Sequence, residues 1–314
     1  SMINKEKKHL SPYEVKKPKN GKKEPEAKKY YFSRTHYYSN VNTNECVAVD
    51  VNRFSKYSNV ENVDTFWVRR AEKYAYGKDL ILKSKRIEKK ENWQEAHFVY
   101  ADTNTNQRIN VRALLKGEVI YILRTNSDSL TQRSKLATEF FKTFTPTDTF
   151  IGKGIFVSKA DEFFEDIYSK DKPTQLGAEN AIENSDVDFF ETDDTTILRN
   201  IRKPDFHSLT LRSKMNIIRG LTNAKNESLA TELKKLYEDY TDSTEIQLVL
   251  LQTLADLKTT SSAKILLELL INDTPPLETQ QEAMDILYPY FDSLALTKQL
   301  YPKILDLTRY SEYK

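Results

Sequence analysis

The stretch RINVRALLKGEVIYIL, residues 108–123, decides the fold of the first half of the chain. Its first part carries apolar side chains at every second position: Ile109, Val111, Ala113 and Leu115. Such alternation is typical of a strand with one buried face. The segment Lys116-Gly117-Glu118 has the composition of a tight turn, and a second apolar run follows it. We therefore predict an antiparallel hairpin formed by residues 109–115 and 119–123.

The stretches on either side of this hairpin complete an α+β domain. Four of them are rich in β-branched and aromatic residues and are predicted strands: 30–38, 46–51, 80–87 and 97–101. Two others, residues 60–74 and 130–144, repeat their apolar side chains with the period of an amphipathic helix. The order ββ-α-ββββ-α predicts an antiparallel sheet with both helices covering one face. Four aromatic side chains are predicted core residues: Trp67, Phe140, Phe141 and Phe144.

The second half of the chain shows helical patterns throughout. The predicted helices are residues 159–169, 174–184, 194–202, 212–222, 226–240, 243–257, 260–271, 277–291 and 294–310. The second helices of the last three pairs begin near residues 226, 260 and 294, a step of 34 residues each time. Such a period is typical of stacked helix pairs and predicts an all-α, HEAT-like solenoid. The buried faces are predicted to continue into the last pair through Met284, Leu287, Tyr288 and Phe291.

Charge divides the chain into three parts. Residues 1–29 contain ten lysines, four glutamates and few apolar side chains, and we predict a basic flexible linker there. A polybasic arm for nucleic acid or anionic lipid is the alternative. Residues 30–155 hold 20 basic and 14 acidic side chains, a net charge of +6, whereas residues 156–314 hold 18 and 28, a net charge of −10. These two ranges are the predicted sheet domain and helical domain.

The sequence offers few residues for catalysis or metal binding. The single cysteine, Cys46, excludes a Cys-based zinc site, and we predict that it is a small buried side chain in a strand. Of the four histidines, His36 and His97 are predicted to lie at the edge of the core, with a catalytic base as the alternative for His97. No motif for nucleophilic catalysis or phosphate binding is present. We therefore predict no catalytic, cofactor-binding or metal-binding residue, and no enzyme.

Two polar segments have features of cation sites. Residues 102–106, Asp-Thr-Asn-Thr-Asn, resemble the start of a calcium loop, but Gln107 and Ala113 stand where that loop needs glycine and glutamate. A hairpin turn is the prediction there. The acidic residues around Asp193 and Asp194 are predicted to form a solvated loop and a helix start.

Four short segments carry a resemblance to a known family: RINVR at 108–112, VIYIL at 119–123, FFKTFTP at 140–146 and FFED at 163–166. This succession of strand, strand and a helix ending in an aromatic corner is similar to the region that follows the TraB/GumN domain in large multidomain envelope proteins of Bacteroidetes-type bacteria. The resemblance implies a PsbP/Mog1-like sheet domain followed by helical repeats, and an accessory role in the cell envelope or periplasm. The hydrolase residues of the TraB/GumN domain itself have no matching positions in this sequence.

These features together predict a non-catalytic protein-interaction or scaffold fragment of a larger envelope-associated protein. The net charge of −10 on residues 156–314 favours a basic protein partner and excludes nucleic acid as the partner of that domain. The basic sheet domain of a second copy is one candidate, which would give a head-to-tail homo-oligomer. Four residues are predicted exposed contacts for a protein partner, with a core position as the alternative for the aromatic ones: Tyr237, Tyr240, Glu245 and Tyr301.

Two alternatives stay open. The first is an accessory part of a hydrolase whose active site lies outside this sequence. The second concerns location, because a protein with one cysteine is compatible with the cytoplasm as well as the periplasm. No apolar run in the sequence approaches the length needed to cross a bilayer, so no transmembrane segment is predicted.

Overall fold

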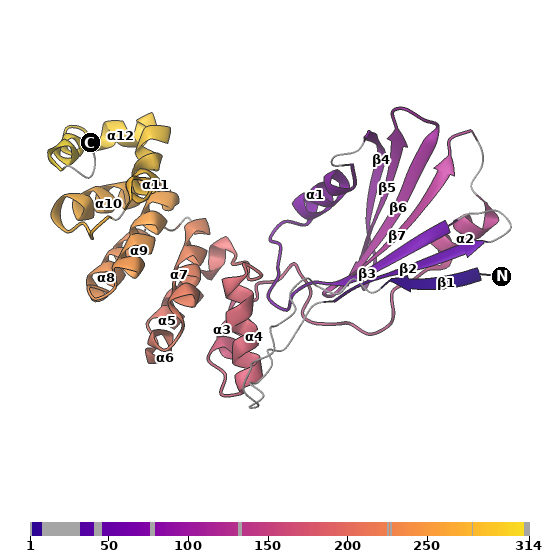
Figure 1. Ribbon diagram of the computed structural model, residues 1–314, viewed down its shortest axis with the longest axis horizontal. Coiled ribbons are helices and arrows are strands. Elements are labelled where there is room, and N and C mark those ends of the chain that lie inside the picture. Colours follow the sequence, from indigo (N-terminus) through magenta and orange to yellow (C-terminus); the bar gives the residue numbers. More distant parts are fainter. Residues whose placement is uncertain are drawn as a thin grey trace. The chain divides into compact units, whose positions relative to one another are not determined.

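The computed structural model describes residues 2–7, 32–40, 46–75, 79–130, 134–224, 226, 228–277 and 279–310. The chain divides into two compact units, residues 1–157 and 158–314, and this division falls close to the predicted change from strands to helices. The protein is therefore of mixed α+β class, with an antiparallel sheet in the first unit and helices in the second (Figure 1).

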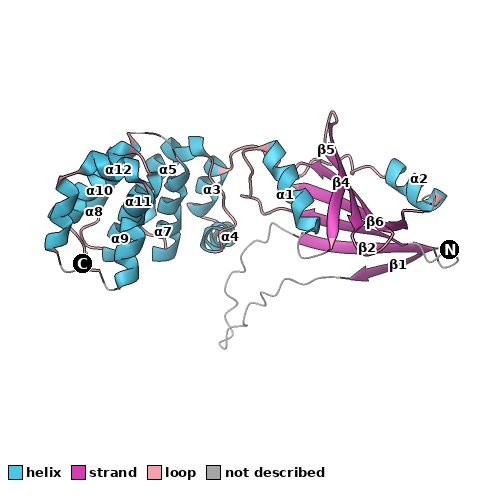
Figure 2. Ribbon diagram, turned by 90° about the horizontal axis from the view of Figure 1, so that it is seen from above, coloured by secondary structure: helices cyan, strands magenta, loops and turns pink. Residues whose placement is uncertain are grey.

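The first unit is built on one antiparallel sheet (Figure 2). Within the described residues it has seven strands, in the order β1-β2-β3-β7-β6-β5-β4. Their bounds are β1 Met2–Lys7, β2 Phe32–Asn40, β3 Cys46–Arg53, β4 Leu80–Lys89, β5 Gln94–Asp102, β6 Gln107–Lys116 and β7 Val119–Asp128. The six strands predicted between residues 30 and 123 are confirmed. The predicted linker differs at Met2–Lys7, where the backbone pairs with β2 as an edge strand; residues 8–29 lie outside the described ones.

The predicted hairpin is strands β6 and β7, which pair antiparallel up to Lys116 and Val119. Gly117 in the turn has a φ of +61°, a backbone conformation that glycine adopts at little cost. A Cβ atom at this position would also lie 2.3 Å from the carbonyl oxygen of Ile151, so the close approach of that segment requires glycine. The main-chain N–H of Glu118 donates to the same oxygen at 2.9 Å.

Two helices pack on opposite faces of the sheet, and the prediction that both cover one face is wrong. Helix α1, Val63–Ala75, lies with Trp67 in a core that contains Phe98 and Ile122. Helix α2, Lys135–Thr143, lies with Phe141 in a second core that contains Leu114 and Leu123. Consecutive strand residues point to opposite faces, so these two cores lie on the two sides of the same strands.

The predicted core aromatic residues divide into two groups. Trp67 is fully buried, and Phe141 is buried. Phe140 and Phe144 are only partly buried, and they pack against the rim of the α2 core. At the end of the described sheet lies β4, whose pairing with β5 is interrupted by a register shift between Leu82 and Ser84.

The second unit consists of short helices in sequence order. Their bounds are α3 Ala160–Ile167, α4 Lys172–Glu183, η1 Glu191–Asp193, α5 Asp194–Ile201, α6 Pro204–His207, α7 Leu211–Arg219, η2 Gly220–Asn223, α8 Leu229–Asp239, α9 Thr244–Leu257, α10 Thr260–Asn272, α11 Gln280–Asp292, α12 Leu294–Leu300 and η3 Lys303–Arg309. Serine and threonine side chains cap several starts, as Ser243 does for α9 and Ser293 for α12. Helix α9 is the most enclosed of them, because α7, α8, α10 and α11 all contact it.

Candidate functional site

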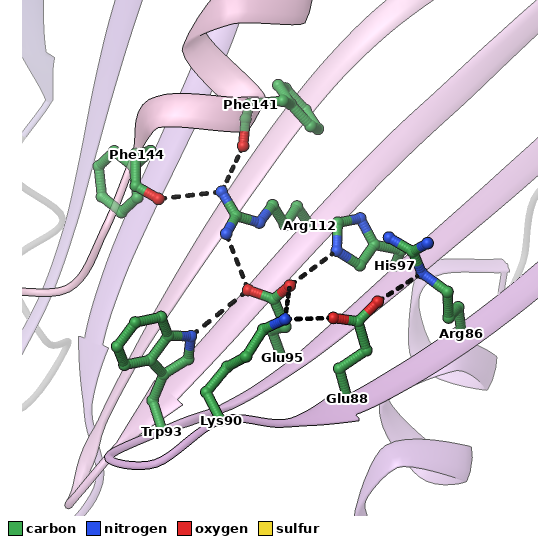
Figure 3. Close-up of polar contacts among 9 residues, drawn as sticks. All are labelled: Arg86, Glu88, Lys90, Trp93, Glu95, His97, Arg112, Phe141 and Phe144. Atoms are coloured by element: carbon green, nitrogen blue, oxygen red, sulfur yellow. Dashed lines mark hydrogen bonds and ion pairs between the residues drawn. The ribbon is translucent and has the colours of Figure 1, made fainter.

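A cluster of charged side chains lies on the α2 face of the sheet (Figure 3). Glu95 and His97 alternate along β5, and Arg112 lies opposite His97 on β6, so the three side chains share this face. Glu95 is 4% exposed and Arg112 is 7% exposed. Two opposite charges buried this deeply are stable only when each finds its partners nearby.

Arg112 connects the sheet to the end of α2. Its Nη2 donates to Oε2 of Glu95 at 2.8 Å. Its Nη1 donates to the main-chain oxygens of Phe144, at 2.9 Å, and of Phe141. The last carbonyls of a helix have no partner within the helix and carry partial negative charge. The guanidinium group therefore neutralises Glu95 and satisfies the C-terminal end of α2 at once.

Glu95 accepts from several donors besides Arg112. The indole Nε1 of Trp93 lies 3.4 Å from Oε2, and Nε2 of His97 lies 3.3 Å from Oε1. Lys90 places its Nζ 3.9 Å from Oε1. Burial by itself raises the pKa of Glu95, but the hydrogen bonds from Arg112 and His97 outweigh it and lower the pKa to about 2. The carboxylate is therefore ionised at neutral pH.

His97 is half-buried beside this carboxylate, in agreement with the predicted core-edge position. Burial lowers the pKa of His97 from its usual value, and the contact with Glu95 counteracts part of that shift. On the solvent side, Arg86 and Lys90 form ion pairs with Glu88. In Figure 3 Glu88 lies between Lys90 and Arg86, and Lys90 lies beside Glu95.

The contacts of this cluster link the sheet to α2. A general base works best with a pKa near the working pH, and a carboxylate with a pKa of about 2 takes up protons poorly. Glu95 is also surrounded by donors on both of its oxygens. Together with the bonds from Arg112 to the end of α2, these contacts hold α2 on the sheet.

A shallow depression of about 560 Å³ lies further along the sheet. Its lining residues are Lys83, Ser84, Val99, Arg108, Asn110, Ser127, Asp128 and Ser129. Neither Glu95 nor His97 is among them, so the charged cluster does not line this depression.

Three residue groups singled out from the sequence are placed as follows. Cys46, predicted to be buried, is exposed at the first position of β3. The segment 102–106 forms the turn between β5 and β6, where Asp102 Oδ1 accepts from the main-chain N–H of Asn104 at 2.8 Å, so the predicted hairpin turn is confirmed. Asp193 and Asp194 are buried, contrary to the predicted solvated loop.

The two aspartates are buried because each bonds to several donors. Asp193 accepts from the hydroxyl of Ser158 and from the main-chain N–H of Phe190, both at 2.7 Å. Asp194 accepts from the side chain of Asn226 at 3.1 Å. The aspartates thus fix the start of α5 by satisfying buried donors. Within the described residues, no group of three or more His, Cys, Asp or Glu side chains is arranged to hold a metal ion.

The four predicted contact residues fall into two pairs. Tyr237 and Tyr240 are buried. The hydroxyl of Tyr237 donates to the main-chain oxygen of Asp273, and the ring of Tyr240 lies 5.6 Å from the ring of His207. They are core residues, and the prediction that they are exposed is wrong. Glu245 in the first turn of α9 is exposed, and Tyr301 after α12 is 68% exposed.

A row of exposed apolar side chains runs along α11, so the prediction that they are buried is wrong. Met284 is 44% exposed, Tyr288 57% and Phe291 70%. Their spacing of four and three residues places them on one side of the helix; we call them the α11 stripe. The adjoining side of α11 is also apolar and is buried: Ala283, Ile286, Leu287 and Tyr290. Apolar side chains on two sides of one helix are the signal that marks this surface in the sequence.

Comparisons with known proteins give little that identifies the chain. The sequence matches no described protein family, and it matches no curated protein. A solved structure that describes lipid–protein interactions in lipovitellin aligns with 91% of this chain, at 11% sequence identity and a TM-score of 0.30. The chain spans 33% of the length of that lipovitellin chain. In the part of the chain that the structure describes, no helix combines the length and apolar character required to cross a membrane.

Proposed function

We propose that the protein is a non-catalytic protein-interaction module, and that its second unit is a HEAT-like solenoid that binds a partner through the α11 stripe. Contacts between residues 34 positions apart support the repeat: Lys234 with Glu268, and Lys258 with Asp292. In such arrays each helix pair covers the apolar face of the pair before it.

The observation that carries the proposal is a difference between equivalent positions in α9 and α11. Thirty-four residues before Met284, Tyr288 and Phe291 of α11 lie Leu250, Leu254 and Leu257 of α9. All three leucines of α9 are buried, whereas all three side chains of the α11 stripe are exposed. The same apolar pattern is therefore covered in α9 and uncovered in α11.

Three further apolar side chains after α11 are also more than half exposed: Leu294 at the start of α12, Tyr301 and Leu305. Clustered apolar side chains on the surface of a folded protein mark sites of protein interaction, because water is released when a partner covers them. The contacts of the cluster around Glu95 lie within the sheet unit. The α11 stripe lies in the helical unit, so the proposed binding activity belongs to that unit. The proposed setting in a cell envelope rests only on the family resemblance described above.

Site-specific photocrosslinking tests the proposal in extracts of the cells that make the protein. The variant Phe291→benzoylphenylalanine is expected to form one discrete covalent adduct with another protein. Leu211→benzoylphenylalanine is the matched control, because Leu211 on α7 is also an exposed apolar residue but lies outside the stripe. The adduct should disappear when Met284→Ser is added to the first variant. Equal adduct patterns at positions 211 and 291, or none at 291, would overturn the proposed function.

A further inference from the structure

The α11 stripe is bordered by acidic side chains. Asp285 directly follows Met284 and Asp292 directly follows Phe291, so both aspartates lie along one edge of the stripe. Asp256 of α9 lies near Asp285 and Lys258, because its pKa, raised mainly by burial, is lowered by the charge of Lys258 and raised by that of Asp285. All three aspartates are exposed. We call Asp256, Asp285 and Asp292 the acidic edge.

The charge at one repeat position reverses between α9 and α11. In α9 this position is Lys258, whose Nζ lies 3.4 Å from Oδ2 of Asp292 on α11. The equivalent position of α11, 34 residues later, is Asp292 itself. Asp292 of α11 meets Lys258. A further helix, packed on α11 in the way that α11 packs on α9, would meet Asp292 at the equivalent position. The complementary side chain on that helix is lysine or arginine.

We propose that the occupant of the α11 stripe is an amphipathic helix of another protein, with its apolar stripe bordered by lysine or arginine. This inference rests on the proposed function. The helical form follows from the repeat, because a helix covers the equivalent stripe of α9. The basic border follows from the acidic edge. A second copy fits less well, since an antiparallel twofold pairing of two α11 stripes places acidic edge beside acidic edge.

Two designed peptides test this inference with the full chain. Both carry leucine at positions i, i+4 and i+7 of a helix; one has lysine on both borders of this row and the other has glutamate. Fluorescence anisotropy is expected to show that the lysine-bordered peptide binds about tenfold more tightly at low salt. The difference should shrink at high salt, because exposed charges are screened.

Charge variants of the protein locate the effect. Asp285→Lys is expected to remove the preference for the lysine-bordered peptide. Glu165→Lys is the matched control, since Glu165 is an exposed acid on α3, at the other end of the helical unit, and it should leave the preference unchanged (Figure 1). Phe291→Ser should abolish binding of both peptides. Circular dichroism of each variant confirms that the helices are intact.

The possible failures are distinguishable from one another. Equal binding of the two peptides would overturn the basic border and leave the apolar site standing. Binding of neither peptide, together with a specific crosslink at position 291, would overturn the helical occupant but not the proposed function. Concentration-dependent dimerisation in sedimentation, lost in Phe291→Ser, would make a second copy the occupant and overturn the inference.

Discussion

Lys258 on α9 and Asp292 on α11 lie 34 residues apart in the sequence and form an ion pair across the two helices. The same separation recurs between Lys234 and Glu268, whose side-chain atoms lie 2.9 Å apart. It recurs again where the side chain of Asn216 donates to the main-chain oxygen of Ile182 at 3.0 Å. Three polar contacts of the helical unit thus join residues 34 positions apart.

The exposure of the α11 stripe predicts unequal effects of substitutions at equivalent positions. Leu254→Ala removes buried carbon atoms and is expected to lower the free energy of unfolding by about 2–5 kcal/mol. Tyr288→Ser at the equivalent position of α11 is expected to change it by less than about 0.5 kcal/mol, since that side chain is 57% exposed. Chemical denaturation followed by far-UV circular dichroism measures both. A large loss in the Tyr288 variant would show that α11 is covered within the chain.

Removing Arg112 should destabilise the sheet unit strongly. Arg112→Met leaves Glu95 charged and buried without its main partner, which costs about 3–5 kcal/mol. Both tryptophans, Trp67 and Trp93, lie in the sheet unit, so their fluorescence during denaturation reports on that unit alone. Arg86→Met, at an exposed ion pair, is the control and should cost less than about 1 kcal/mol. If the two variants lost equal stability, Arg112 would not be a structural link.

The stability of the sheet unit should fall in acid because of Glu95. Its pKa is about 2 in the folded protein and near the usual value of 4.5 in the unfolded chain. Below pH 4.5 the unfolded chain therefore binds more protons, and the free energy of unfolding decreases as the pH falls toward 2. The loss is on the order of 3 kcal/mol, and it should be absent in Glu95→Gln. Denaturation of both proteins by urea at several pH values, followed by tryptophan fluorescence, measures the difference.

The two ends of the aromatic row on α2 should respond differently to truncation. Phe141→Ala is expected to cost about 3 kcal/mol or more, because its ring is buried in the α2 core. Phe144→Ala should cost less, since its ring is only partly buried and its bond to Arg112 comes from the main chain. The same fluorescence measurement compares them. Equal losses would contradict the division between the buried ring and the rim.

The sheet could be predicted from the sequence because alternation and turn chemistry are local. The hairpin at Gly117 is fixed by neighbouring residues, and the structure reproduces it. The side of the sheet on which a helix packs is not local information. Helix α1 contacts one set of alternate strand residues, such as Phe98, and α2 contacts the other set, such as Leu114. The amphipathic pattern of a helix shows which of its own sides is buried, but not which of the two sets of strand residues that side contacts.

The burial of aromatic residues in the helical unit also depends on contacts that are distant in the sequence. The helical spacing of Tyr237 is compatible with a surface contact or a core position, and in the structure the main-chain oxygen of Asp273 satisfies its hydroxyl in the interior. Phe291 continues an apolar series and was assigned to the core, but no described segment covers it. The cluster around Glu95 was missed as well, because its residues come together only when β5, β6 and α2 are assembled.

Strand β4 has a consequence for how the protein behaves in concentrated solution. It is the last strand of the described sheet, and it carries Lys83, Lys85, Arg86 and Lys89 together with the register shift after Leu82. Cationic side chains and irregular pairing on an edge strand prevent the strand of another molecule from extending the sheet. The cationic side chains of β4 thus disfavour the addition of a strand from another molecule. Replacing the lysines by neutral residues is expected to favour such pairing without altering any residue of the core.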